Sequence, residues 1–181
     1  MSARLRARAG RGGATASRRR RGAMFAYLAV FFTSTVLMGA LTFDFARLAN
    51  LKAELQTSAD AGAHAGVLRF MQSGCGSGTA YNNIRSQAQS YAVANLAMQA
   101  TVTVDSNEVG DWNPGAQTFT ALGACSGAVD AVRLVVSVQA SGLFMSLAGV
   151  TAPRVRARAI AWRCTSGFSP SCVTPRSVLV R

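Results

Sequence analysis

Hydrophobic and polar positions along the chain follow a small number of successive patterns. Residues 22–43 are uncharged and mostly apolar, and they follow directly on four arginines, Arg18, Arg19, Arg20 and Arg21. Over residues 44–71, apolar or small residues recur every three or four positions, which is the period of one helix face. A shorter helical pattern covers residues 80–98, and beyond residue 100 the period becomes two, which indicates β-strands. These patterns predict an α+β protein that begins with one long helix.

The uncharged run predicts a membrane-spanning helix from Ala23 to Phe43. As a helix the run is about 33 Å long, which matches a hydrocarbon core of about 30 Å. Each strongly apolar side chain favours insertion by roughly 0.3–0.6 kcal/mol near the membrane centre. The alternative, a buried core helix of a soluble domain, would rarely lack charge over this length. A cleavable signal is disfavoured because its apolar stretch is shorter and ends in a small-x-small site.

The flanks of the run predict its orientation. Residues 1–22 hold eight arginines and no acid, and supply most of the formal net charge of +12. The positive-inside rule therefore places this basic arm in the cytoplasm and residues 44–181 on the other side. We expect the arm to contact anionic lipid headgroups. Nucleic-acid binding is disfavoured because the arm has no interleaved aromatic residues.

Residues 44–71 are predicted to continue the helix outside the membrane, because they contain no proline. Gly62 and Gly66 each cost roughly 1 kcal/mol in a helix relative to alanine. Their presence therefore indicates a close approach by another backbone, most simply that of the protein's own domain. The face concerned changes from bulky to small side chains: Leu48, Leu51, Leu55, Ser58, Ala59, Gly62 and Gly66.

Residues 72–163 are predicted to form a small α+β domain with a second helix and a mainly antiparallel sheet of about four strands. The expected strands are 101–104, closed by a turn at 105–107, then 117–122 after a turn at 113–115, then 131–140 and 154–163. One face of the last strand carries Arg154, Arg156 and Arg158. We interpret it as a solvated face that discourages edge-to-edge aggregation. The alternative is a surface that binds an acidic partner or lipid headgroups.

All four cysteines, Cys75, Cys125, Cys164 and Cys172, follow the predicted span. In an oxidising compartment they predict two disulfides, with three possible pairings. A Cys164–Cys172 bond would close a short loop in the tail formed by residues 164–181. Cys75–Cys125 would then tie the end of the long helix to the sheet. Zinc binding is disfavoured because there is no C-x-x-C pair and the only histidine, His64, lies in the predicted helix.

The sequence shows no constellation that would support catalysis. It has one histidine, seven acidic residues and neither of the glycine-rich phosphate-binding motifs. We therefore expect a protein that is not an enzyme, with no cofactor, no metal and no small-molecule substrate.

Several segments resemble the TadE/TadG-like proteins of tight-adherence (Flp-type) pilus systems, most of all the short TadG-like members. The segments are Arg20-Arg21-Gly22, the span exit at Asp44, the helix block with Leu55, Gln56, Ala59 and Asp60, and the closing strand. The resemblance implies a single-pass protein of the bacterial inner membrane, whose partners are membrane lipid and other pilus-assembly proteins. It implies a non-enzymatic role in pilus assembly or secretion.

Two departures from related proteins refine this expectation. Processed pilins and pseudopilins are cut after a glycine and carry Glu at the fifth mature position, where this chain has Tyr27. The resemblance therefore implies an unprocessed signal-anchor, with a processed minor pseudopilin as one alternative. A membrane-anchored extracytoplasmic binding or sensing module is the other. Long TadG-like relatives carry an Asp-x-Ser-x-Ser metal motif that this sequence lacks, so adhesive metal binding is not expected.

Overall fold

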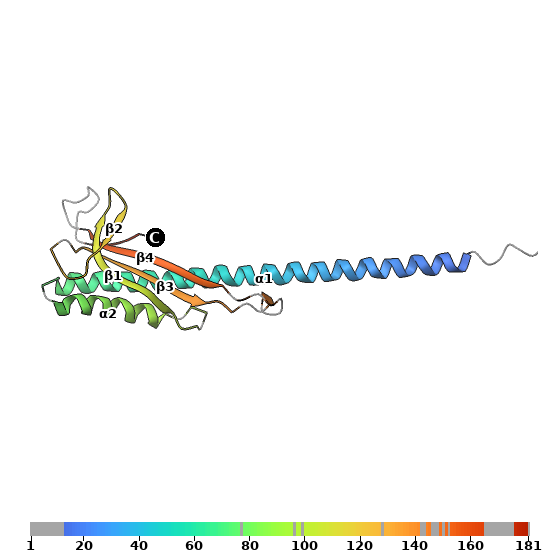
Figure 1. Cartoon of the computed structure of the whole chain (residues 1–181), viewed down its shortest axis with the longest axis horizontal. Coiled ribbons are helices and arrows are strands. Elements are labelled where there is room, and N and C mark those ends of the chain that lie inside the picture. Colours follow the sequence, from blue (N-terminus) through green and yellow to red (C-terminus); the bar gives the residue numbers. More distant parts are fainter. Residues whose placement is uncertain are drawn as a thin grey trace, which may run out of the picture. The chain divides into compact units, whose positions relative to one another are not determined.

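The computed structural model describes residues 13–76, 78–95, 97–98, 100–127, 129–141, 144–145, 149, 151, 153–164 and 176–180, with side chains described from residue 23 to residue 164. The elements are two helices, α1 (Gly13–Ser73) and α2 (Gly78–Ala94), followed by strands (Figure 1). The strands are β1 (Thr103–Asn113), β2 (Thr118–Ala121), β3 (Ala131–Gln139), β4 (Arg154–Cys164) and β5 (Arg176–Val180). The chain forms two compact units, Met1–Asp44 and Phe45–Arg181. The predicted α+β class is confirmed.

Helix α1 is longer than predicted at its N-terminal end. It begins at Gly13 rather than Ala23, so that the backbone of Arg18–Arg21 is helical. This stretch is free of proline and rich in alanine and arginine, which are among the best helix formers. The helix ends at Ser73 because Gly74 adopts a positive φ of 64° and donates its N–H to the carbonyl of Phe70 at 2.8 Å. The gap between the two helical patterns of the sequence, residues 44–71 and 80–98, thus contains the end of α1.

The sheet is antiparallel and has the strand order β2-β1-β3-β4-β5. It has one strand more than the number predicted, because β5 pairs with the end of β4 within the segment that was expected to be a tail. The predicted strands 117–122, 131–140 and 154–163 correspond closely to β2, β3 and β4. The predicted turn at 113–115 is also present, and the Asn113 side-chain oxygen accepts hydrogen bonds from the N–H groups of Gly115 and Ala116 at 3.0 Å.

The predicted turn at residues 105–107 is wrong, because β1 runs straight through this segment. Asp, Ser and Asn favour turns by bonding to their own backbone. Here the Asp105 carboxylate accepts bonds from β3 and β4 instead, and the Asn107 amide donates to the carbonyl of Arg85 in α2 at 2.7 Å. The irregularity that the sequence signals appears only as a register shift between Val104 and Ser106.

Helix α2 and the C-terminal half of α1 cover one face of the sheet (Figure 1). Close packing confirms the expectation drawn from the two helix glycines. A Cβ placed on Gly62 would lie 2.5 Å from Cδ2 of Leu134 and 2.7 Å from the carbonyl oxygen of Ala88. Most other side chains of this core are short or medium-sized; those most fully buried include Leu55, Ala59, Ala63, Val67, Ile84, Ala88, Ala92, Val109, Val136, Ala159 and Ala161.

The opposite face of the sheet is only partly as predicted. Arg154, Arg156 and Arg158 are exposed there, but Ile160 and Trp162, from the same face of β4, are each only 6% exposed. These two residues join Trp112, Ala131 and Phe119 in a second, smaller hydrophobic cluster. The outer face of β4 is therefore charged in its first half and apolar in its second half.

Candidate functional site

The apolar segment of α1 is the first candidate site. Among the described residues, α1 is the one helix that is long and apolar enough to cross a membrane. Its large side chains are exposed: those of Phe25, Tyr27 and Met38 are each more than 70% exposed. Its hydroxyl side chains donate to the carbonyl four residues earlier, for example Thr35 to Phe31 at 2.9 Å and Thr42 to Met38 at 2.8 Å. Internal bonds of this kind reduce the penalty for placing a hydroxyl in lipid.

The second candidate is the helix block that the sequence singled out. Leu55 and Ala59 are completely buried in the core. The side-chain amide of Gln56 makes polar contacts instead. Its Nε2 donates to Oδ1 of Asp60 at 2.8 Å and to the carbonyl of Arg158 in β4 at 3.0 Å. Leu55 and Ala59 therefore fill the core, and Gln56, which Asp60 holds within α1, joins the helix to the sheet. Asp44, which closes the apolar segment, is 4% exposed.

On the β5 side, no described strand pairs with the first half of β4, because β5 pairs with residues 160–164 only. Side chains of α1 satisfy the carbonyls there. Lys52 donates to the carbonyl of Arg156, and Gln56 donates to the carbonyl of Arg158. Four residues of helix advance about 6 Å and two residues of strand advance about 6.6 Å, so the two spacings match. Helix side chains thus protect an exposed strand edge from pairing with another chain.

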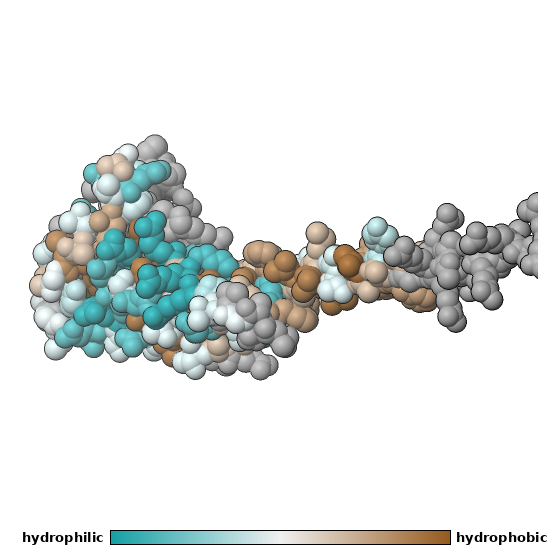
Figure 2. Space-filling view, turned by 45° about the vertical axis from the view of Figure 1, so that its right-hand side comes forward, coloured by the Kyte–Doolittle hydropathy of each residue, from teal (hydrophilic) through white to brown (hydrophobic). Residues whose placement is uncertain are grey.

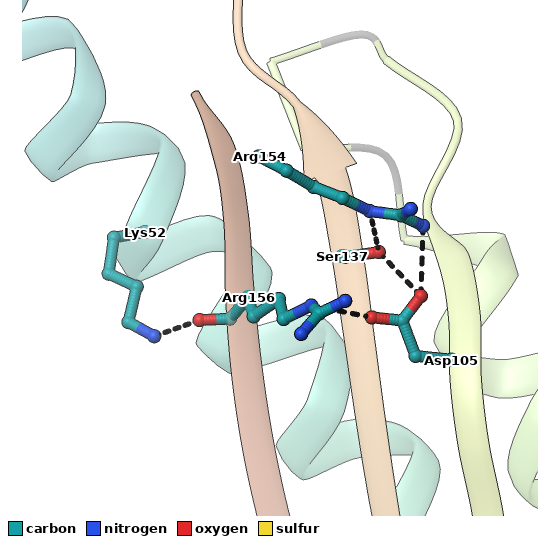
Figure 3. Close-up of polar contacts among 5 residues, drawn as sticks. All are labelled: Lys52, Asp105, Ser137, Arg154 and Arg156. Atoms are coloured by element: carbon teal, nitrogen blue, oxygen red, sulfur yellow. Dashed lines mark hydrogen bonds and ion pairs between the residues drawn. The ribbon is translucent and has the colours of Figure 1, made fainter.

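The third candidate is a cluster of charges on the outer face of the sheet (Figure 3). The Asp105 carboxylate binds two arginines of β4, with Oδ1 2.9 Å from the Arg154 guanidinium and Oδ2 3.1 Å from Nε of Arg156. The buried Ser137 hydroxyl links them, since it accepts from Nε of Arg154 at 2.9 Å and donates to Asp105 at 2.8 Å. The register shift in β1 at residues 104–106 lies beside Asp105, and such bulges re-aim side chains. Lys52 reaches β4 beside Arg156.

The sequence reasoning missed both Lys52 and Asp105. Lys52 had no pattern to mark it, although it is the only lysine of the chain. Asp105 was assigned to a turn, and the signal that could have corrected this is the row of three arginines on one strand face. Such a row needs a counter-charge, and few acidic residues are present to supply it.

A disulfide joins Cys75 to Cys125, with a Cα–Cα distance of 5.1 Å and a separation of 50 residues. It ties the segment just after α1 to the loop between β2 and β3. Cys164 is also disulfide-bonded and is 1% exposed. The prediction about Cys172 lies outside the described residues, as do the side chains of Arg18, Arg19, Arg20 and Arg21.

The titratable groups give no constellation for catalysis within the part of the chain that is described. No three His, Cys, Asp or Glu residues there lie close enough together to hold a metal ion. Burial raises the pKa of Asp130 to about 6, although the N–H of Trp112, 2.8 Å from its Oδ1, partly opposes the shift. Asp130 sits at the start of β3, where its backbone also bonds to Gly110 and Arg163. These contacts hold Asp130 between β1, β3 and β4, which is a structural role.

Comparison with known proteins identifies the family of this chain. A family model described as putative Tad-like Flp pilus-assembly matches residues 49–161, which is more than half of the chain. A second, described as putative Flp pilus-assembly TadE/G-like, matches residues 22–72. The two matched ranges overlap at the helix block of α1 that joins the sheet. Searches among curated proteins and among solved structures find no match. The chain therefore belongs to the Tad-like Flp pilus-assembly family of TadE/G-like proteins.

Proposed function

We propose that this protein is a non-enzymatic, TadG-like component of Flp-type pilus assembly or secretion. Helix α1 anchors it in the inner membrane, with its N-terminus in the cytoplasm and its sheet domain on the outer side. The observation that carries this proposal is the Cys75–Cys125 disulfide, which lies beyond the apolar segment in the chain. Disulfides form and persist outside the reducing cytoplasm. The disulfide and the eight N-terminal arginines therefore favour the same orientation.

The exposed surface of the chain supports an anchor. Residues between Met24 and Phe43 present large apolar side chains to their surroundings, and these appear as a brown stretch in Figure 2. Soluble monomers rarely expose contiguous apolar surface of this extent. The visible face of the sheet domain in Figure 2 is mostly hydrophilic, as expected for a domain in water.

The residue at position 27 favours an uncleaved anchor over a filament subunit. Cleavage after Gly22 would leave a free ammonium group at Ala23, next to the apolar segment. In filament subunits a glutamate four residues later can pair with that group. Tyr27 offers a hydroxyl but no negative charge, and an isolated charge in an apolar surrounding is expensive. The protein is therefore expected to keep its basic arm and its arginine cluster.

Reporter fusions test the topology. A reporter that is active only after export should be active when it is fused at Arg181, and a reporter active only in the cytoplasm should be silent there. The opposite pattern would overturn the orientation. Unreduced, denatured protein should also show no reaction of Cys75 or Cys125 with a thiol reagent until a reductant is added. Reactive thiols at these positions in freshly extracted protein would remove the observation on which the orientation depends.

Intact-mass analysis of protein extracted from membranes separates the anchor from the pseudopilin. The expected species retains Arg18–Arg21. A species that begins at Ala23 would identify a processed pseudopilin instead, whatever the reporters show. A matched variant, Tyr27→Glu, asks whether the missing glutamate is what prevents processing.

A further inference from the structure

We propose that Lys52, Arg154, Arg156 and Arg158, here called the basic cluster, bind the phosphate groups of anionic lipids in the outer leaflet of the membrane that α1 crosses. This inference rests on the proposed function, since it needs an anchored domain on the outer side. It assigns the arginine face of β4 the role of a lipid contact rather than that of a solvated face alone.

The charges of the basic cluster are poorly balanced within the protein. Asp105 is the acidic residue that ion-pairs with it, and one carboxylate faces two guanidinium groups there. Arg158 is exposed and makes no ion pair with any described residue, while Lys52 donates to an uncharged carbonyl. The cluster therefore keeps an excess of positive charge at the surface, where an anion can approach.

Asp105 also arranges the cluster for binding. It fixes the guanidinium groups of Arg154 and Arg156 on the same face of β4, two residues apart and therefore about 6.6 Å along the strand. Their side chains remain 48% and 66% exposed. A guanidinium has five N–H donors, and these contacts leave several of them free for phosphate oxygens. Because the side chains are already held, less conformational entropy is lost when they bind.

The covalent structure places the cluster within reach of a membrane surface. Lys52 lies nine residues after Phe43 on the same helix, a path of about 13 Å. The interfacial layer on each side of the hydrocarbon core is about 5–8 Å thick, and the Debye length adds about 8 Å at physiological salt. Arg47 lies closer still along the helix. The connection along the chain is therefore short enough for anionic headgroups beside the span to attract these cations.

A second copy of the chain would bind to the basic cluster less well than lipid does. Most acidic residues of the described domain are already engaged within it, so a neighbouring copy has few carboxylates to offer. Glu108 pairs with Arg133, Asp60 accepts from Gln56, Glu54 accepts from the N–H of Met98, and Asp130 accepts from the N–H of Trp112. Lipid phosphate is supplied by the surroundings instead.

The single lysine makes the proposal testable on the full chain. The protein is placed in nanodiscs of phosphatidylcholine, or of phosphatidylcholine with an equal amount of phosphatidylglycerol. The rate of Lys52 modification by an uncharged amine reagent is then followed by peptide mass. We expect the rate of Lys52 modification to be lower by about threefold or more in the discs with phosphatidylglycerol, because lipid phosphate groups bind and cover the Lys52 ammonium group. The difference should shrink at 0.5 M salt, where the Debye length is only about 4 Å.

Variants separate the cluster from a general effect of the anionic surface. Arg154→Gln/Arg156→Gln should lose most of the difference between the two discs, whereas Arg154→Lys/Arg156→Lys should keep it. Arg69→Gln, on α1 but about 25 Å further along the helix than Lys52, is the control for loss of positive charge away from the cluster and should behave as the unchanged protein.

Three outcomes would overturn the proposal. Equal Lys52 rates in the two discs would remove lipid binding, and an unchanged difference in the Arg154→Gln/Arg156→Gln variant would remove the role of the cluster. Protection by added polyglutamate that is equally strong in both discs would reassign the surface to an acidic protein segment. Failure of the proposed function looks different, because a chain that is not anchored by α1 would not co-elute with the discs at all.

Discussion

The two halves of α1 have similar helical geometry but opposite surroundings. From Met24 to Phe43 the large side chains are bulky and exposed, and the glycine of this half, Gly39, has nothing within 4 Å of a Cβ placed on it. From Leu51 to Phe70 the helix face that meets the sheet is buried, and its glycines, Gly62 and Gly66, lie against side chains and backbone of α2 and β3. One half needs an apolar solvent, whereas the other needs a specific partner surface.

The difference shows that composition and shape select different environments. Lipid accepts any apolar side chain, so the first half can carry Phe, Leu, Val and Met in no particular order. A packed interface accepts only what fits, so the second half uses small residues where α2 approaches and larger ones where space remains. The following predictions test this contrast, from the largest expected effect to the smallest.

A charge in the middle of the first half should weaken membrane anchoring most. Phe32 is 61% exposed, and Phe32→Arg replaces a favourable residue with one that costs about 3 kcal/mol at a membrane centre. That change is comparable to the whole insertion energy of the segment, about 3–5 kcal/mol. The fraction of protein that resists alkaline carbonate extraction should fall sharply. Phe32→Leu should behave as the unchanged protein, and full resistance in the arginine variant would show that the segment is held by something other than lipid.

Adding one methyl group should distinguish the two halves. Gly62→Ala places a Cβ 2.5–2.8 Å from atoms of Leu134, Ala88 and Ala92, so it should destabilise the domain by about 1–2 kcal/mol despite the better helix propensity of alanine. Gly39→Ala meets nothing and should leave domain stability unchanged. Denaturant unfolding in detergent, followed by the fluorescence of the two tryptophans, measures both. Equal effects would contradict the close packing of the second half.

The stability of the packed unit should respond to mildly acidic pH. Asp130 has a pKa of about 6 in the folded chain and about 3.8 when unfolded. Its carboxyl group therefore ionises more readily in the unfolded chain than in the folded one. Its contribution to stability is therefore fully present below about pH 4 and is lost as the pH rises through 6. Asp130→Asn should remove this dependence and stabilise the domain at pH 7.5 by about 1 kcal/mol, after allowance for solvent screening.

The measurement for Asp130 is the difference in unfolding free energy between the variant and the unchanged protein at pH 4.5, 6 and 7.5. The difference should grow with pH, since asparagine imitates the protonated acid and can still accept the bond from Trp112. A difference that stays constant would mean that Asp130 titrates normally. Asp111→Asn removes a neighbouring negative charge that helps to raise the pKa of Asp130, so it should weaken the pH dependence without removing it.

Most of the fold could be predicted from the chain because local pattern and tertiary environment agree. Gly74 ends α1 by its own backbone freedom, and Val132, Leu134, Val136 and Val138 alternate as a strand that faces a core. Prediction failed where a long-range partner overrode the local signal. The Asp105-Ser106-Asn107 segment lies inside β1 because its polar side chains bond to other elements. Helix α2 ends at Ala94 rather than Met98, where the Asn95 amide donates to the carbonyl of Tyr91 at 2.8 Å.

The candidate sites divide in the same way. The apolar segment, the arginine arm and the family were evident from residues that are contiguous in the chain, since each depends on local composition or motif. The charge cluster around Asp105 unites residues 52, 105, 137, 154 and 156, which meet only because α1 and three strands come together. The same holds for the cover that Lys52 and Gln56 give to the edge of β4. Their spacing matches the strand, but which carbonyls they reach depends on the placement of a helix against a sheet, and that placement is set by packing over the whole domain.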